Sequence, residues 1–340
     1  MKRIFTRLLL SAVMMMCCTV MNAQTTFEVG GIKYSVTGEN TVEVVEKFPI
    51  YSGTVVIPSA VTYSNTTYNV TGIGNDAFFA CSKLASITLP EGITSIGASA
   101  FIGCCNLNTI TISESVTCIK DCAFQGCTSL TSLTIPEKVT SIGTDAFFNC
   151  TGLAAITVAE GNTVYESPDN CNAIIEKSTH TLLWGCKNTV IPNTVTRINT
   201  NAFRWHSDLT SITIPESVTS IGDGAFLATG LTSVVIGKSV ETIGKSAFKS
   251  CSNMTEIHVL ATTPPTLGTD AFDIVPKDIP VYVPDVDAYK KTSWGEFTNL
   301  IKYVDLPTAK EEAIADLQTY INEEKIANAK IRSCQQFFFA

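Results

Sequence analysis

Cysteine is the most chemically versatile residue type in this sequence, and many of its copies follow a regular spacing. The chain has 13 cysteines. Thiolates at regular spacing could bind a metal ion, but such a site needs further ligands, and no histidine accompanies these cysteines. We therefore predict an inward-facing ladder of small buried side chains. Each member stands three residues after a phenylalanine in an A-F-x-x-C pattern: Cys81, Cys104, Cys127, Cys150 and Cys251.

Two further cysteines, Cys171 and Cys186, lie symmetrically about a Ser178-Thr179 turn. The segments Ala173–Glu176 and Thr181–Trp184 on either side are predicted to form a hairpin that projects from the rest of the fold. In an exported protein the two thiols could form a cross-strand disulfide. The pattern alone leaves this pairing and two free thiols both open.

Histidine, the usual general base, occurs three times, as His180, His206 and His258. None stands in a recognisable motif with a serine or cysteine nucleophile. The sequence also lacks H-E-x-x-H, G-x-S-x-G and P-loop motifs. We therefore expect no catalytic, cofactor-binding or metal-binding residues, and no enzymatic activity.

The part of the sequence that contains these cysteines and histidines is built of repeats with a period of about 23 residues. One copy, Leu209–Phe226, reads LTSITIPESVTSIGDGAF, and its final Ala-Phe pair recurs along the chain. The step from Ala146 to Ala202 is longer and contains an insertion. A period of about 20–29 residues with an L-x-x-L-x-L core is typical of leucine-rich repeats. We predict a mainly β repeat solenoid of about ten turns, with short strands and single helical turns.

Within one repeat, the I-T-I triplet alternates with the two-residue period of a strand. Ile212 and Ile214 are predicted to face the core, and Ser211 and Thr213 to face outward. Pro215 cannot donate to a strand ladder, so the strand should end before it. A second short strand should then lead to the next turn.

Two further predictions concern the residues that follow the second strand, a glycine and an acidic residue. Gly222, which recurs in most copies, is expected to turn the chain with a positive φ. Acidic residues before the Ala-Phe pair, such as Asp145, Asp223 and Asp270, are expected to cap a single helical turn.

The combined pattern L-x-S-I-x-I-P-x-x-V-T-S-I-G-x-x-A-F-x-x-C resembles the BspA-like (Treponema-type) leucine-rich repeats of bacterial surface proteins. The resemblance covers roughly Tyr51 to Val304. It implies a secreted or surface-attached protein that binds other macromolecules and has no enzymatic activity of its own.

The sequence predicts four segments. Residues 1–23 have the basic start, short apolar run and Ala23 of a secretory signal peptide, and no other stretch is expected to span a membrane. Residues 24–50 are predicted to form an N-terminal β cap, and residues 51–305 the solenoid, with the hairpin insertion at about 159–185. Residues 306–340 are predicted to form a C-terminal helix and tail, which a T-x-x-E capping box opens at Thr308–Glu311. We expect the mature protein to be secreted or held at the cell surface.

The composition and net charge of the chain limit the kinds of molecule that it could bind. The chain is 45% hydrophobic and only 16% charged, with a net charge of −8. The negative charge argues against nucleic acid and against an anionic membrane as direct partners.

The outward positions of the first strands form a ladder of small hydroxyl side chains that could bind a protein or a glycan. The predicted ligand-binding residues of this ladder are Ser86, Thr88, Thr109, Thr111, Ser132, Thr134, Ser211 and Thr213. A rival location is the insertion, where Tyr165 and Trp184 would suit binding if they are exposed.

Three functions remain open. The first is an adhesin-like module for extracellular or surface proteins of a host or a neighbouring cell. The second is a glycan-binding or nutrient-capture accessory, which should show clustered exposed tryptophan or tyrosine. The third is a structural spacer in the cell envelope.

Overall fold

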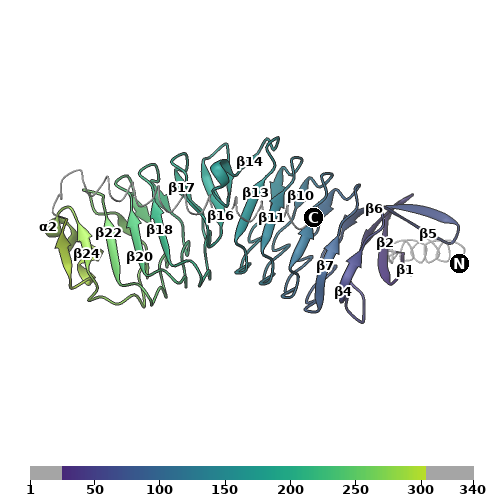
Figure 1. Ribbon diagram of the computed structural model, residues 1–340, viewed down its shortest axis with the longest axis horizontal. Helices are drawn as coiled ribbons and strands as arrows, with labels where there is room; N and C mark the ends of the chain where they lie inside the picture. The colour runs from purple at the N-terminus through teal and green to yellow at the C-terminus, as the bar shows by residue number, and fades with distance from the viewer. Residues whose placement is uncertain (1–24, 304–340) are drawn as a thin grey trace, which may run out of the picture.

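The computed structural model describes residues 25–303, which form an elongated solenoid of about ten turns (Figure 1). The described chain starts at the right of the view and ends at the left, near the short helix α2 (Val286–Lys290). The mainly β solenoid predicted from the repeat is therefore confirmed. The signal peptide predicted for 1–23 and the helix and tail predicted for 306–340 lie outside the described residues.

The first strand of each turn builds one side of the solenoid. In the Leu209 repeat Ile212 and Ile214 are buried, Ser211 and Thr213 are exposed, and the strand ends before Pro215, as predicted. Most neighbouring first strands pair in parallel, and their residues lie in register. These strands are β4 (Gly53–Val56), β7 (Leu84–Thr88), β9 (Thr109–Thr111), β11 (Ser132–Ile135), β13 (Ala155–Val158), β18 (Ser211–Ile214), β20 (Ser233–Ile236), β22 (Glu256–Val259), β24 (Val281–Val283) and β25 (Leu300–Lys302).

The second strands, most of them two residues long, build another side. They are β6 (Thr66–Ile73), β8 (Ser95–Ile96), β10 (Cys118–Ile119), β12 (Ser141–Ile142), β16 (Thr181–Gly185), β17 (Arg197–Ile198), β19 (Ser220–Ile221), β21 (Thr242–Ile243) and β23 (Thr266–Leu267). The glycine that follows does not have the predicted positive φ at Gly97 or Gly222. A Cβ at Gly97 would lie 2.5 Å from the backbone nitrogen of Asn75, in the preceding turn. Glycine is therefore required there for close stacking of turns, not for backbone conformation.

The Ala-Phe segments form the third side as hydrogen-bonded turns, without the predicted helical turn. The left-handed residue is the one before the alanine, for example Asp145 with a φ of 52°. Asp223 does not cap its own turn: its Oδ1 accepts a hydrogen bond of 2.7 Å from the backbone N–H of Lys245, in the next turn. These acidic residues are therefore not N-caps, and the Asp223 carboxylate joins one turn to the next.

The repeat phenylalanines stack through the core in two columns. Phe78, Phe101, Phe124 and Phe147 follow one another with ring centroids 5.0, 5.1 and 5.5 Å apart. The second column has spacings of 4.9, 5.0 and 5.0 Å and consists of Phe203, Phe226, Phe248 and Phe272. Each column begins or ends on another aromatic ring, with Tyr51 on Phe78 and Trp294 on Phe272.

The N-terminal end is closed by an antiparallel sheet of β1 (Thr26–Val29), β2 (Ile32–Gly38) and β3 (Thr41–Val44). β3 then pairs in parallel with β6, which also pairs with β5 (Ala60–Tyr63), so the cap continues the sheet of second strands. At the other end, the short helix η2 (Ser293–Glu296) buries Trp294 next to α2.

The insertion contains β14 (Tyr165–Glu166), the short helix η1 (Pro168–Asn170) and β15 (Ala173–Glu176). β15 and β16 form the predicted hairpin, but it does not project. β16 pairs in parallel with β17 and so serves as a second strand of the solenoid. Two hydrophobic clusters meet here, one containing residues from Phe27 to Cys186 and the other residues from Cys171 to Phe297.

Candidate functional site

The outward positions of the first strands form the candidate site, which we call the hydroxyl face. Its exposed side chains on the N-terminal half lie on strands β7 to β13. Among the predicted residues, Thr88, Thr109, Thr111, Ser132, Thr134, Ser211 and Thr213 are exposed and Ser86 is half-buried. Parallel pairing in register aligns these side chains across neighbouring turns.

Hydroxyl groups on this face bond to one another from turn to turn. Ser86 Oγ donates to Thr54 Oγ1 at 3.0 Å, and the Thr134 and Thr157 hydroxyl oxygens are also 3.0 Å apart. Thr54 and the exposed Val56 thus extend the face by one turn beyond the predicted residues. Their T-V-V-I-P sequence carries the same alternation and could have been recognised.

The hydroxyl face is interrupted between Thr157 and Ser211. The pairing of first strands stops between β9 and β11, which remain neighbouring turns in contact, and again between β13 and β18. Only between β13 and β18 does a turn lack its strand, at residues 188–191. The structure therefore divides the predicted site into two parts. The larger part holds the residues from Ser86 to Thr134, and the smaller holds Ser211 and Thr213.

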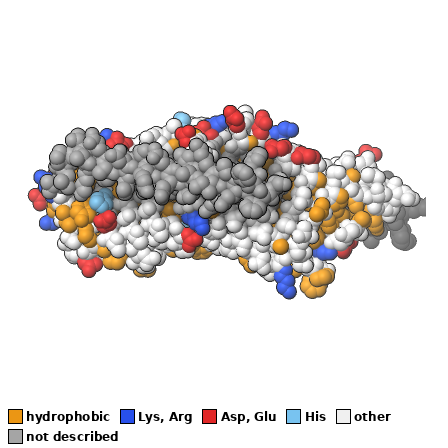
Figure 2. All heavy atoms as spheres, viewed as in Figure 1, with side chains coloured by type: hydrophobic (Ala, Val, Ile, Leu, Met, Phe, Trp, Pro, Cys, Tyr) orange, Lys and Arg blue, Asp and Glu red, His pale blue; other side chains and the backbone are white. Residues whose placement is uncertain are grey.

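Toward the C-terminal end the face changes from hydroxyl to aromatic side chains. The His258 ring stacks on Tyr282 at 4.6 Å and meets the edge of Tyr303 at 6.4 Å. His258 Nε2 also lies 3.5 Å from a carboxylate oxygen of Glu256. In Figure 2, charged side chains gather along the upper edge of the view, and the visible middle is mainly uncharged.

The exposure on which the rival location at the insertion depends is not found, because Tyr165 is buried and Trp184 is half-buried. Tyr165 is buried, and its hydroxyl accepts a hydrogen bond of 3.1 Å from the backbone N–H of Ile142. Trp184 is half-buried and packs edge-on against Phe147, with ring centroids 5.7 Å apart. Both residues hold the solenoid together at the insertion.

The candidate disulfide between Cys171 and Cys186 is not formed, and both are buried free thiols. Glu176 pairs with Thr181 as the symmetric hairpin predicts, but a β-bulge at Ile174/Ile175 shifts the register by one residue. Continued past Ala173 and Gly185, the shifted register places Cys186 opposite Asn172 instead of Cys171. Cys186 Sγ lies 3.5 Å from the backbone oxygen of Asn172.

The repeat cysteines form the predicted inward ladder, and all five are buried free thiols. Cys104, Cys127 and Cys150 each donate through Sγ to the backbone oxygen of the phenylalanine in the preceding turn, at 3.1 to 3.3 Å. Burial raises the pKa of the Cys104 and Cys150 thiols to about 12, so they stay protonated and unreactive near neutral pH. Within residues 25–303, no group of three or more His, Cys, Asp or Glu is placed to hold a metal ion.

The predictions missed a cluster beside the insertion in which Trp205 is exposed and Phe148 and Arg204 are half-buried. The Arg204 guanidinium carbon lies 5.2 Å from the Phe148 ring centre and 4.8 Å from that of Trp205. The two rings are 4.9 Å apart, and Trp205 is 39% exposed with a φ of 68°. Other turns place small residues such as Ala80 or Gly103 at this left-handed position. The insertion removes one Ala-Phe turn between Phe148 and Trp205, which is why no sequence pattern pairs them.

No helix in the described part of the chain is long and apolar enough to cross a membrane.

Comparison with known proteins agrees with this architecture. The family model of the BspA type leucine rich repeat region (6 copies) matches residues 58–172 and 173–276. No curated protein matches the chain.

Several solved bacterial structures share the fold. A leucine rich cell surface protein from Faecalibacterium prausnitzii is 23% identical with a TM-score of 0.50, over 86% of this chain and 98% of that chain. The pneumococcal vaccine antigen PcpA is 18% identical with a TM-score of 0.52, over 83% of this chain and 99% of that one. A leucine-rich repeat protein from Eubacterium ventriosum is 22% identical with a TM-score of 0.50, over 82% and 85% of the two chains.

Proposed function

The chain belongs to the BspA-type leucine-rich repeat family, and on this premise we propose that it is a non-enzymatic binding protein of the bacterial cell surface. Its partner is an extracellular protein of a host or a neighbouring cell. The observation that carries the proposal is the hydroxyl face, which presents exposed hydroxyl side chains over several turns and aligns them within the pairs β7–β9 and β11–β13.

The chemistry of the hydroxyl face suits a protein partner. Serine and threonine hydroxyls both donate and accept hydrogen bonds, and they can follow the backbone or polar side chains of an opposing surface. Because the face carries no charge from Thr54 to Thr157, electrostatic steering should be weak. Many copies on one cell could still bind strongly together through avidity.

The test places charge and bulk on the face without disturbing the core. Thr111→Arg together with Thr134→Arg should weaken binding to a partner found by pull-down from extracellular-matrix proteins. The matched control is Thr117→Arg with Thr140→Arg, which adds the same side chains at exposed positions next to the second strands of the same turns. If both pairs fold and bind equally well, the recognition surface lies elsewhere.

Glycan binding is the second candidate function, and the cluster of Phe148, Arg204 and Trp205 favours it. An exposed tryptophan can stack on a sugar ring, and a guanidinium beside it can donate to hydroxyl or carboxylate groups. A glycan array should then detect binding that Trp205→Ala abolishes and that the Thr111/Thr134 double variant leaves intact. Loss of glycan binding in the double variant instead would move the glycan site to the hydroxyl face.

A further inference from the structure

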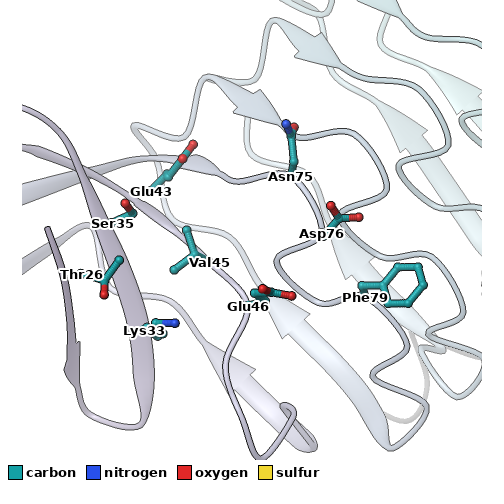
Figure 3. A pocket seen from close by; sticks show the side chains of 9 residues that line it. All are labelled: Thr26, Lys33, Ser35, Glu43, Val45, Glu46, Asn75, Asp76 and Phe79. Atoms are coloured by element: carbon teal, nitrogen blue, oxygen red, sulfur yellow. The ribbon is translucent and has the colours of Figure 1, made fainter. Parts of the chain in front are cut away.

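An open pocket of about 480 Å³ lies where the N-terminal cap meets the first Ala-Phe turn (Figure 3). This volume is in the range of small-ligand sites. Its floor comes from the outer side of the cap sheet and its wall from the turn. The lining residues are Thr26, Lys33, Ser35, Glu43, Val45, Glu46, Asn75, Asp76 and Phe79.

The strand register explains why these side chains gather. Thr26 pairs with Ser35 across β1 and β2, Ser35 with Glu43 across β2 and β3, and Glu43 with Gly72 on β6. Residues paired in this way point to the same face of a sheet. Gly72 adds no side chain at the end of the row, and the Glu43 side chain lies against it, with Oε2 3.9 Å from where a Cβ would be.

The pocket carries an excess of negative charge. Glu43, Glu46 and Asp76 line it together with one cation, Lys33. None of these three carboxylates forms an ion pair with another residue of the described chain. The neighbouring Lys47 is already paired with Glu28, at 3.1 Å. The pocket therefore offers carboxylates that the fold itself leaves uncompensated.

A buried hydroxyl points independently to a ligand. Ser35 is only 1% exposed, it lines the pocket, and its Oγ has no hydrogen-bond partner. A buried polar group without a partner is costly, so native structures seldom leave one unexplained. A donor entering the pocket would supply the missing partner. Phe79, which is 49% exposed, forms an apolar and π-rich rim.

We propose that this pocket binds a protonated primary amine. The ammonium group bonds to Glu43 and Asp76 and comes within reach of Ser35, and its alkyl chain lies against Phe79. An alkylammonium has three donors and no acceptor, which matches carboxylates, a hydroxyl and an aromatic rim. The carboxylates do not converge as metal ligands in the described chain, and the pocket is wide enough for an organic cation.

Two kinds of molecule carry such an ammonium group, a partner protein with an exposed lysine side chain and a free polyamine. Nα-acetyl-lysine methylamide represents the first and spermidine the second, and both would be titrated against the folded protein by calorimetry. Binding of either probe supports the ammonium site and identifies its source. The lysine derivative acetylated on Nζ should not bind, because it has lost its charge. Binding of neither cation overturns the proposal.

Charge-neutral variants test whether the carboxylates of Glu43 and Asp76 bind the amine. Glu43→Gln with Asp76→Asn should weaken binding of the amine roughly tenfold or more, since charge-assisted hydrogen bonds are lost. Asparagine tolerates the left-handed φ of 54° at position 76. The matched control is Glu114→Gln with Asp145→Asn, because Asp145 occupies the same left-handed position three turns away. Equal affinity in the two double variants would contradict the site.

Ser35→Ala separates binding from folding. If Ser35 faces a ligand, the variant should bind the amine several-fold more weakly and unfold no more readily than the wild type, because the hydroxyl has no partner within the fold. Reduced stability with unchanged amine affinity would assign Ser35 a structural role and overturn its part in the site. This site is separate from the hydroxyl face, so the result does not depend on the function proposed above.

Discussion

The regular turns and the junction at the insertion are held together in different ways. The regular turns are held together mainly by backbone hydrogen bonds. Most neighbouring strands pair in parallel and in register, and bonds such as that from the Phe124 N–H to the Ala146 oxygen, at 2.8 Å, recur from turn to turn. The phenylalanine rings stack nearly parallel there. At the junction one turn has no first strand, at residues 188–191, and Trp184 packs edge-on where a stacked phenylalanine would stand.

Side chains replace the missing backbone contacts at the junction. Asn162, which is buried, donates through Nδ2 to the backbone oxygens of Pro136 and Val139, both at 2.9 Å. Its Oδ1 accepts from the N–H groups of Val164 and Tyr165 at 2.9 and 2.8 Å. One asparagine thus hydrogen-bonds to four backbone groups of two neighbouring turns.

The ladder position also changes at the junction. His206 stands three residues after Phe203, where most other turns have cysteine. Its imidazole is buried, and Nδ1 has no hydrogen-bond partner. A regular turn thus depends on many equivalent contacts, whereas the junction depends on a few individual side chains.

The largest effect is expected from Phe147→Ala, at the end of the first phenylalanine column. The side chain is 4% exposed, and truncation of a core phenylalanine costs about 3–5 kcal/mol. Phe124→Ala in the regular column should cost a similar amount. Because Phe147 also contacts Trp184, only Phe147→Ala should separate the unfolding of the two halves in chemical denaturation followed by tryptophan fluorescence. A cost below about 1 kcal/mol would show that Phe147 contributes little to the core.

Asn162→Ala should cost about 3 kcal/mol, because it leaves several buried backbone groups without partners. Asn106→Ala, at an exposed asparagine in a regular turn, is the control and should change stability by less than about 0.5 kcal/mol. Both would be measured by urea denaturation. Similar small effects in the two variants would contradict the special role of the junction side chains.

The stability of the junction should depend on pH through His206. Burial, followed by the nearby Lys187, lowers the pKa of this imidazole from 6.5 to about 4, although Asp208 opposes the shift. Between these values the unfolded chain binds a proton that the folded chain does not, so the free energy of unfolding decreases as the pH falls. The loss should reach at most about 3 kcal/mol near pH 4, with none above pH 6.5.

The control for this pH dependence is His206→Cys, which restores the ladder residue of the regular turns. Its free energy of unfolding should change less between pH 6.5 and 4 than that of the wild type. Identical pH profiles for the two proteins would show that His206 does not titrate in this range.

The smallest effect is expected from Cys127→Ala in a regular turn. The change removes one buried sulfur and its hydrogen bond of 3.3 Å to the Phe101 oxygen, and it should cost about 1 kcal/mol in thermal denaturation. A cost as large as that of Asn162→Ala would remove the distinction between the two regions.

The period, the two short strands and the core-facing side of each strand could be predicted from the amino-acid sequence alone. These features depend on local alternation, as at Ile212 and Thr213, and each copy of the repeat gives the same information again. The inward cysteine ladder follows from the same period. The uncharged hydroxyl face was predicted for the same reason, since an outward position in one turn stacks on the outward position of the next.

Which neighbour covers each side chain could not be predicted in this way, because it depends on how distant segments pack. The bulge in β15–β16 separates Cys171 from Cys186, and the return of the hairpin to the solenoid buries Tyr165 against Ile142. The cap sheet and the first turn together create the pocket around Ser35 and Glu43. Such contacts join different strands and turns of the chain, and the alternation within one strand says which way a side chain points but not what lies above it.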